Sequence, residues 1–183
     1  MATVTLIPNA AGDLTECLPN PVVANYLNVD ESPADDDATY VSGDIGLGEG
    51  VPSRDLYRDT DPTHAVPDGA TGISITVYTR NRSTLNTKRA NFVIAIKISG
   101  GWYGQAITAP STTWTDANKT WATNPFTGLA WTPAEINALQ LGHSITPNSG
   151  LYTGLCTYCR AIVTFTPGAA GLASRRLLVG VGL

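Results

Sequence analysis

The sequence predicts an all-β protein, an antiparallel β-sandwich or jelly roll that carries one short helix. Hydrophobic and polar residues alternate at period two in several segments, which is the spacing of strands with one buried face. Eighteen glycines and twelve prolines supply turns, and only 14% of the residues are charged. The 183 residues suit one domain, which we place at residues 1–167, followed by a tail at 168–183.

The clearest strand patterns lie in the middle and near the end of the chain. Isoleucine and valine alternate with polar residues over 73–79, and residues 92–98 repeat the pattern. Gly100-Gly101 follows, which predicts a hairpin that pairs residues 92–98 with 102–107. Further strands are expected at residues 160–165, 2–7, 38–42, 112–121 and 141–146.

One short helix is predicted over residues 133–140. Thr132 suits its N-cap, Pro133 its first turn, and Glu135 stands where a capping box requires a carboxylate. We expect this helix to close one end of the sandwich, with apolar contacts from Ile136, Leu139 and Leu141.

Two segments lack strand alternation. Residues 43–70 are rich in glycine and proline, and we expect a long irregular loop there that drapes the surface or binds a partner. The tail ends in apolar residues that would promote aggregation if left in water, so we expect it to dock as a strand or hook. Its candidate contacts between copies are Arg175, Arg176, Leu177, Leu178, Val179, Val181 and Leu183.

Charge is unevenly distributed along the chain. Residues 1–70 hold thirteen of the fifteen acids and only two bases, a net charge of −11, whereas residues 71–183 carry +7. Such asymmetry is satisfied within one fold or between copies that meet acidic face to basic face. We favour contacts between copies, made by Arg80, Arg82, Lys88 and Arg89.

Several classes of function are disfavoured. The chain has no G-x-S-x-G, H-E-x-x-H or P-loop motif, so we expect neither an enzyme nor a cofactor. Its bases have no aromatic residues between them, which argues against nucleic acid as a partner. No apolar run approaches the roughly 20 residues of a membrane helix, and the first residues lack a signal-peptide pattern. We therefore expect synthesis in the cytoplasm and no membrane partner.

An acidic stretch is a candidate for calcium. Asp30, Glu31, Asp35, Asp36 and Asp37 place five carboxylates within eight residues, and calcium binds several such oxygens. The spacing of an EF-hand is absent. A solvated acidic loop, or one that meets a basic face, is the favoured interpretation.

The three cysteines leave several alternatives open. The C-x-x-C pair, Cys156 and Cys159, leads into a strand, whereas thioredoxin-type chemistry requires a helix N-terminus. A disulfide from Cys17 to one member of the pair would link the first segment to the last strand. Otherwise the three thiols are small core residues. A zinc site would need two more ligands, and the candidates, Cys17, His64 and His143, are scattered along the chain.

Aromatic residues gather between positions 102 and 131. Aromatic side chains on a β-sandwich can stack on sugar rings, which makes Trp102 and Tyr103 candidates for glycan stacking. The favoured interpretation is that the tryptophans fill the core and seal its ends, because Trp114 and Trp121 flank polar turn residues.

Several segments resemble small β-sandwich, jelly-roll-like proteins on the virions of tailed phages and related prokaryotic viruses. They include residues 4–13 (Val-Thr-Leu-Ile-Pro-Asn-Ala-Ala-Gly-Asp), 29–40 (Val-Asp-Glu-Ser-Pro-Ala-Asp-Asp-Asp-Ala-Thr-Tyr), 75–80, and 120–132 with the predicted helix. The resemblance covers most of residues 2–166. It implies a decoration or cement protein, a turret protein or a tail-associated protein, without catalytic residues.

We therefore expect a non-enzymatic structural protein on a virion surface, which cements or decorates a capsid as a homo-oligomer. Its partners would be other copies of itself and a major capsid protein or another virion protein. One alternative is a carbohydrate-binding module or adhesin-like β-sandwich that takes a glycan. A second alternative is the subunit of a self-polymerising extracellular filament, which would require export.

Overall fold

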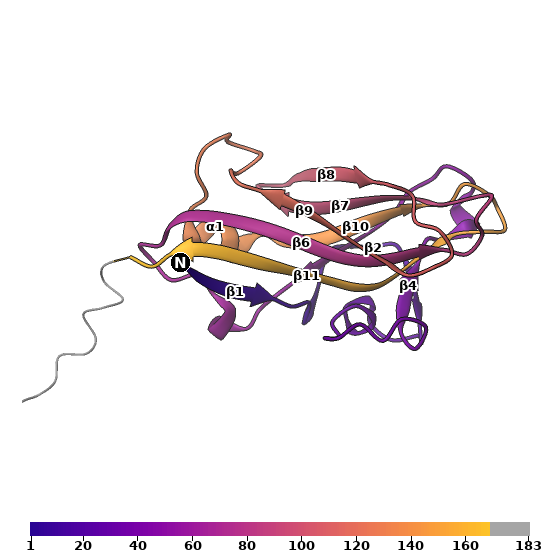
Figure 1. The fold of residues 1–183 in the computed structure, drawn as a ribbon, viewed down its shortest axis with the longest axis horizontal. Coiled ribbons are helices and arrows are strands. Elements are labelled where there is room, and N and C mark those ends of the chain that lie inside the picture. The colour runs from indigo at the N-terminus through magenta and orange to yellow at the C-terminus, as the bar shows by residue number, and fades with distance from the viewer. Residues whose placement is uncertain (169–183) are drawn as a thin grey trace, which may run out of the picture.

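The computed structural model describes residues 1–168, which form an antiparallel β-sandwich of two sheets (Figure 1). Sheet A contains, in spatial order, β3 (Leu18–Asn20), β4 (Tyr40–Ser42), β11 (Gly154–Thr166), β6 (Thr71–Ser83) and β9 (Thr115–Trp121), and β1 (Ala2–Leu6) also pairs with β11. Sheet B contains β2 (Ala10–Thr15), β5 (Ser53–Arg58), β10 (Gln140–Thr146), β7 (Asn91–Ile98) and β8 (Gly101–Ile107). The predicted fold class is confirmed.

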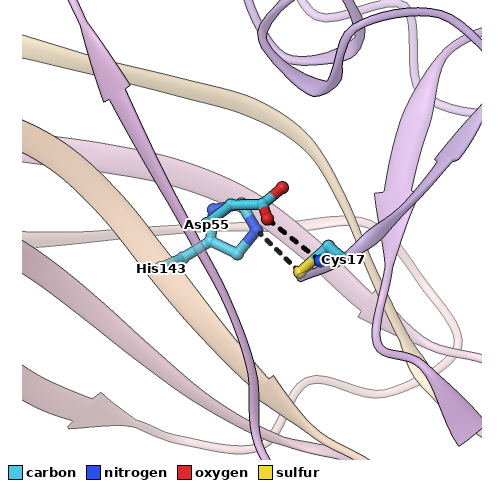
Figure 2. A group of neighbouring side chains, drawn as sticks. All are labelled: Cys17, Asp55 and His143. Atoms are coloured by element: carbon cyan, nitrogen blue, oxygen red, sulfur yellow. Dashed lines mark hydrogen bonds between the residues drawn. The ribbon is translucent and has the colours of Figure 1, made fainter. Parts of the chain in front are cut away.

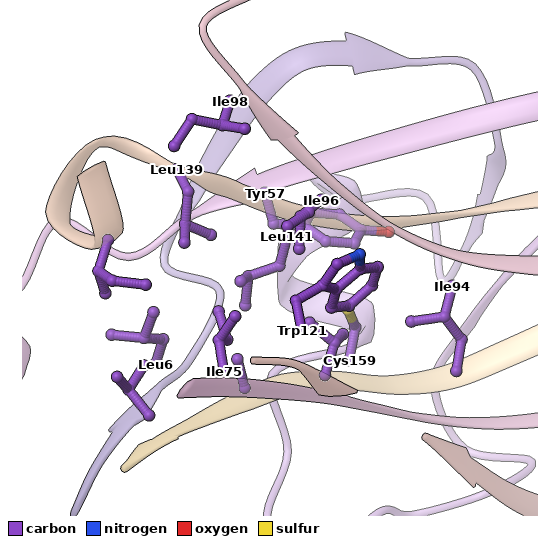
Figure 3. Packing of buried hydrophobic residues seen from close by; sticks show 14 of the residues in the cluster. Leu6, Tyr57, Ile75, Ile94, Ile96, Ile98, Trp121, Leu139, Leu141 and Cys159 are labelled. Carbon is purple, nitrogen blue, oxygen red and sulfur yellow. The ribbon is translucent and has the colours of Figure 1, made fainter. Parts of the chain in front are cut away.

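The core lies between the two sheets and follows the predicted alternation. Figure 3 shows Ile94, Ile96 and Leu141 of sheet B packed toward Ile75 and Trp121 of sheet A. These side chains are at most 9% exposed. Because each strand places every second residue on one face, the alternate residues are left to form the outer faces of the sandwich.

The predicted hairpin is confirmed, with its turn one residue earlier than expected. Ile98 pairs with Gly101, so the two turn residues are Ser99 and Gly100. Both have positive φ, at 50° and 79°. This is the conformation that a two-residue hairpin turn requires, because its twist matches that of the strands.

The predicted helix forms, as α1 (Pro133–Ala138), at the end of the sandwich where the N-terminus lies (Figure 1). The capping box is present: the Thr132 hydroxyl accepts from the Glu135 N–H, and the Glu135 carboxylate accepts from the Thr132 N–H. The helix ends earlier than predicted because Leu139 is extended and β10 begins at the next residue. Three 3-10 turns complete the described elements: η1 (Asn25–Asn28), η2 (Ile45–Leu47) and η3 (Pro62–His64).

The prediction that residues 43–70 form an irregular loop is wrong at β5, which lies between β2 and β10. Asp55 and Tyr57 of β5 are buried, whereas Arg54 and Arg58 are exposed. The period-two pattern holds at these four positions, although Leu56 between them is also buried. An aspartate at an inward position concealed it, because carboxylates are rarely buried without dedicated partners.

Part of the uneven charge is satisfied within the fold by Arg80 and Arg82, whose expected contacts between copies stay a prediction. Arg80 pairs with Asp36 and with Asp116, and the Arg82 Nη2 lies 2.7 Å from an Asp37 oxygen. The acidic first part of the chain thus meets the basic second part in the same molecule. Salt bridges between copies are not needed to neutralise either arginine.

Other predicted contacts between copies stay predictions or fall outside the described structure. Lys88 and Arg89 are exposed on the connection between β6 and β7. The tail residues lie beyond residue 168, outside the described residues; they are Arg175, Arg176, Leu177, Leu178, Val179, Val181 and Leu183. Within residues 1–168, no helix is long and apolar enough to cross a membrane.

Replacing Thr132 with alanine should lower the free energy of unfolding by about 1 kcal/mol, because the Glu135 N–H loses its cap. Urea denaturation followed by circular dichroism measures this change. Thr108→Ala, at an exposed threonine just after β8, is the matched control and should change stability by less than about 0.5 kcal/mol. Equal unfolding midpoints for the two variants would contradict the role of the cap.

Candidate functional site

A shallow groove of about 740 Å³ lies on the outer face of sheet A. Strands β6, β9 and β11 contribute its floor, and Ser32, Pro33 and Ala34 form one wall. The three floor strands are adjacent in the sheet, so their outward-facing residues form rows across it. The groove therefore collects side chains from parts of the sequence that are up to 128 residues apart.

Two tyrosines lie on the floor of this groove. Tyr78 of β6 is opposite Arg160 of β11, and Tyr158 of β11 is opposite Arg80 of β6. The two rings are thus diagonal neighbours on adjacent strands, with Cβ atoms roughly 7–8 Å apart. Both tyrosines are half-buried, which leaves part of each side chain accessible from the groove.

Polar side chains flank the tyrosines. Asn118 of β9 is opposite Tyr78, and Asp116 is opposite Arg80. Both residues are exposed, and both line the groove. The groove thus combines aromatic rings, an amide, a carboxylate and guanidinium groups, which together suit a ligand that has both apolar faces and hydroxyl groups.

The two arginines of the groove, Arg80 and Arg160, differ in their hydrogen-bond partners. Arg80 donates from Nε and Nη2 to Asp36, and from Nη1 to Asp116 at 3.0 Å. These hydrogen bonds raise the pKa of Arg80 above its ordinary value. Arg160 instead lies over the Tyr158 ring, 4.9 Å from its centroid, and its Nη1 is 3.4 Å from the Ser32 hydroxyl. Its Nε is buried without a hydrogen-bond partner among the residues described.

The predicted glycan-stacking residues do not form a common surface. Trp102 and Tyr103 are consecutive in β8, so they point to opposite faces of sheet B. Tyr103 packs against the core, opposite Ile96. Trp102 lies on the outer face, with the Arg54 guanidinium 5.8 Å from its ring centroid. A stacking role for Trp102 alone stays a prediction.

Sequence reasoning missed Tyr78 and Tyr158, although a signal was present. Each of the two longest strands carries a Tyr-x-Arg triplet, Tyr78-Thr-Arg80 and Tyr158-Cys-Arg160. The two side chains of such a triplet share a face, and antiparallel pairing of two triplets places each tyrosine beside an arginine. A search for repeated outward-facing triplets would have found them.

Calcium binding at the acidic stretch stays the less favoured alternative, and two of its five carboxylates are engaged elsewhere. Asp36 and Asp37 turn to the arginines of β6, and Asp35 shares the Thr39 hydroxyl with Glu31. Burial raises the pKa of Asp30 and of Glu31. The interpretation as an acidic loop that meets a basic face is confirmed.

A second group of functional side chains, Cys17, Asp55 and His143, is buried between the sheets (Figure 2). One atom of each lies within 4.8 Å of the others, and the Cys17 Sγ is 3.9 Å from the His143 Nε2. These residue types are metal ligands. Among residues 1–168, no other group of three or more Cys, His, Asp or Glu residues has ligand atoms this close together.

The hydrogen bonds of Asp55 leave it no lone pair for a metal. Its Oδ1 accepts from the backbone N–H groups of Glu16 and Cys17, at 2.8 and 3.0 Å. Its Oδ2 accepts from the Asn25 amide and the Tyr57 hydroxyl, at 2.6 and 3.0 Å. A carboxylate offers about four acceptor positions, and all four are used. Asp55 therefore fixes the segment before β3 onto β5.

The protonation states of the two other side chains also disfavour metal binding and nucleophilic catalysis. Burial raises the pKa of the Cys17 thiol well above its ordinary value, and burial lowers the pKa of His143. The pair is thus a neutral thiol beside a neutral imidazole, whereas a nucleophile or zinc ligand requires the thiolate. His64, the other predicted zinc ligand, is elsewhere, with its Nδ1 2.6 Å from Asp59.

The three cysteines are buried free thiols, so the predicted disulfide from Cys17 to Cys156 or Cys159 does not form. All three belong to the hydrophobic core. The alternative that they are small core residues is confirmed.

Replacing Asp55 with asparagine should destabilise the protein by about 3 kcal/mol, because buried donors then face an amide NH₂ group. Urea denaturation at pH 7 measures this loss. Asp68→Asn, at an exposed loop position, is the matched control and should be near neutral. An Asp55→Asn variant as stable as this control would disprove the anchoring role.

Comparisons with known proteins give distant structural likenesses only. No protein-family model matches the chain, and no curated protein matches it. Similar solved structures include the C-terminal CBM6 of the marine laminarinase LamC from Zobellia galactanivorans, with 12% identity, a TM-score of 0.43, and coverage of 89% of this chain and 100% of that one. The CBM35 of Cellvibrio japonicus Abf62 has 14% identity, a TM-score of 0.40, and coverage of 92% and 100%. A xylan-binding module, CBM15, has 16% identity, a TM-score of 0.40, and coverage of 92% and 94%.

These findings overturn the resemblance to phage virion surface proteins. The structures named are carbohydrate-binding modules, and none of them is a virion protein. The capsid-cementing function and the capsid partner that followed from the resemblance are therefore unsupported. TM-scores below 0.5 are too low to transfer a ligand to this chain, whose own groove has to support any binding role.

Proposed function

We propose that the protein is a non-enzymatic carbohydrate-binding β-sandwich that holds a glycan in the groove of sheet A. One observation carries this proposal: Tyr78 and Tyr158 lie as diagonal neighbours on the floor of a groove that polar side chains also line.

The chemistry of the groove matches the two kinds of surface on a sugar. A sugar ring presents C–H groups on its faces and hydroxyl groups at its rim. A tyrosine ring supplies an apolar surface with little conformational freedom, and it can hydrogen-bond through its hydroxyl. Asn118 and Asp116 supply a donor and acceptors beside the rings.

The strands hold this arrangement in place before a ligand arrives. Tyr78 and Tyr158 belong to β6 and β11, which pair along most of their thirteen-residue lengths. Side chains on paired strands lose less freedom on binding than side chains on loops, so more of the contact energy remains as affinity. The groove is partly open to solvent, which leaves room for a ligand that extends beyond it.

Tyr78→Ala and Tyr158→Ala should each weaken glycan binding about tenfold, equivalent to about 1.4 kcal/mol for the loss of one aromatic contact. A glycan array identifies ligands, and isothermal titration calorimetry then measures the dissociation constants. Tyr152→Ala, at a tyrosine outside the groove, is the matched control and should bind as the unmodified protein does.

A third variant, Trp102→Ala, tests whether the glycan binds on the outer face of sheet B instead. If Trp102→Ala abolished binding and both groove variants retained it, the site would lie on sheet B and the groove proposal would be wrong. Absence of binding to any glycan on the array would count against a carbohydrate-binding function altogether.

A further inference from the structure

We infer that the ligand of the groove is an anionic glycan, whose carboxylate or sulfate group binds Arg160. This inference rests on the proposed function and specifies its ligand class. It starts from the contrast between Arg80 and Arg160, which line the same groove on adjacent strands.

Two carboxylates already take three of the five N–H donors of Arg80 and neutralise its charge. Its Nε and Nη2 face Asp36, and its Nη1 faces Asp116. The pair with Asp36 is of the bidentate kind, which is among the strongest that an arginine forms. Arg80 organises the groove and does not recognise a ligand.

Arg160 lacks such acceptors. It forms no ion pair with any residue from 1 to 168, and its one hydrogen bond, to the Ser32 hydroxyl, is long at 3.4 Å. Its Nε is shielded from solvent and has no protein partner in this part of the chain. A guanidinium group in this state gains more from an incoming anion than a fully solvated one does.

The charges that line the groove lead to the same conclusion. They are Arg80, Asp116 and Arg160, and the first two pair with each other. Arg160 is therefore the unmatched charge of the groove lining. Asp36 lies beyond the lining and is held by Arg80.

The position of Arg160 links charge recognition to ring stacking. Its guanidinium lies 4.9 Å from the centroid of the Tyr158 ring, a cation–π arrangement that holds the charge beside the ring. A sugar on the floor of the groove would have its substituents beside Arg160, because Tyr78 is directly opposite Arg160 in the sheet. An acidic substituent on such a sugar supplies the acceptor that Arg160 lacks.

The test compares two acidic glycans with their neutral methyl esters, and adds a sulfated glucan as an anion of another kind. The probes are oligogalacturonate and oligoglucuronate, the methyl esters of both, and a sulfated glucan, measured by calorimetry in 20 mM and 300 mM NaCl. We expect at least one anionic probe to bind about tenfold or more tightly than its neutral counterpart, and salt to reduce this preference. Preference for the sulfated glucan over both uronates would support the inference with sulfate as the anion.

Two substitutions assign the preference to one residue. Arg160→Gln should abolish the preference for the anionic probe, so that the acid and its neutral ester bind equally. Arg160→Lys should retain part of the preference, because it keeps the charge and loses the planar fork. Arg89→Gln removes an equal charge at an exposed position outside the groove and should have no effect.

The outcomes separate this inference from the proposed function. Equal binding of acid and ester, with both lost in Tyr78→Ala, would leave carbohydrate binding intact and overturn the anionic ligand. A preference for the acid that survives in Arg160→Gln would overturn the role of Arg160. Failure of every probe to bind, while the array identifies a neutral ligand, would also overturn the inference; failure on the array as well would overturn both proposals.

Discussion

The pairing of β6 with β11 is the constraint on which the rest of the structure depends. Both strands are thirteen residues long, and their inward residues provide the centre of the core, including Ile75 and Cys159. The same register places Tyr78 opposite Arg160 on the outer face. A shift of one residue in either strand would reverse which face each side chain occupies, so core and groove would be lost together.

A β-bulge in β11 sets this register. The pairing shifts between Cys156 and Tyr158, which leaves Thr157 as the extra residue. Cys156 and Cys159 are three positions apart, so a regular strand would place them on opposite faces. Because the bulge changes the alternation between them, both are buried, and Tyr158 faces the groove. The bulge therefore explains why both cysteines of the C-x-x-C pair lie on the buried face of β11.

The parts of the fold that could be predicted are those that local residue patterns determine. Alternation along β6, β7 and β11 and the capping box of α1 depend on neighbouring residues, and the structure contains all of them. β5 could not be predicted, because the burial of Asp55 depends on donors such as Asn25, 30 residues away in the chain. The groove likewise depends on the strand order and on the bulge in β11. Neither can be read from the alternation of apolar and polar residues. The Tyr-x-Arg triplets were visible, but only the register shows that they meet.

The internal charge pairing explains how the wall of the sheet A groove is held in place. On sheet A, Arg80 and Arg82 hold the acidic loop against β6, and this loop carries the groove wall at residues 32–34.

On sheet B, the chain satisfies its own outward-facing groups. Asp13 accepts from Lys97 at 2.7 Å and from Arg58 at 2.6 Å, and the hydrogen bond from Lys97 contributes most to lowering the pKa of Asp13 to about 2. Arg54 lies over Trp102 on the same face. A ligand on sheet B would have to displace these contacts before it could make its own, and that cost lowers affinity. On sheet A, Arg160 lies over Tyr158 and near the Ser32 hydroxyl, but it has no carboxylate partner among residues 1–168. The uneven charge of the sequence thus builds the groove wall through Arg80 and Arg82, and it leaves Arg160 without an ion pair in this part of the chain.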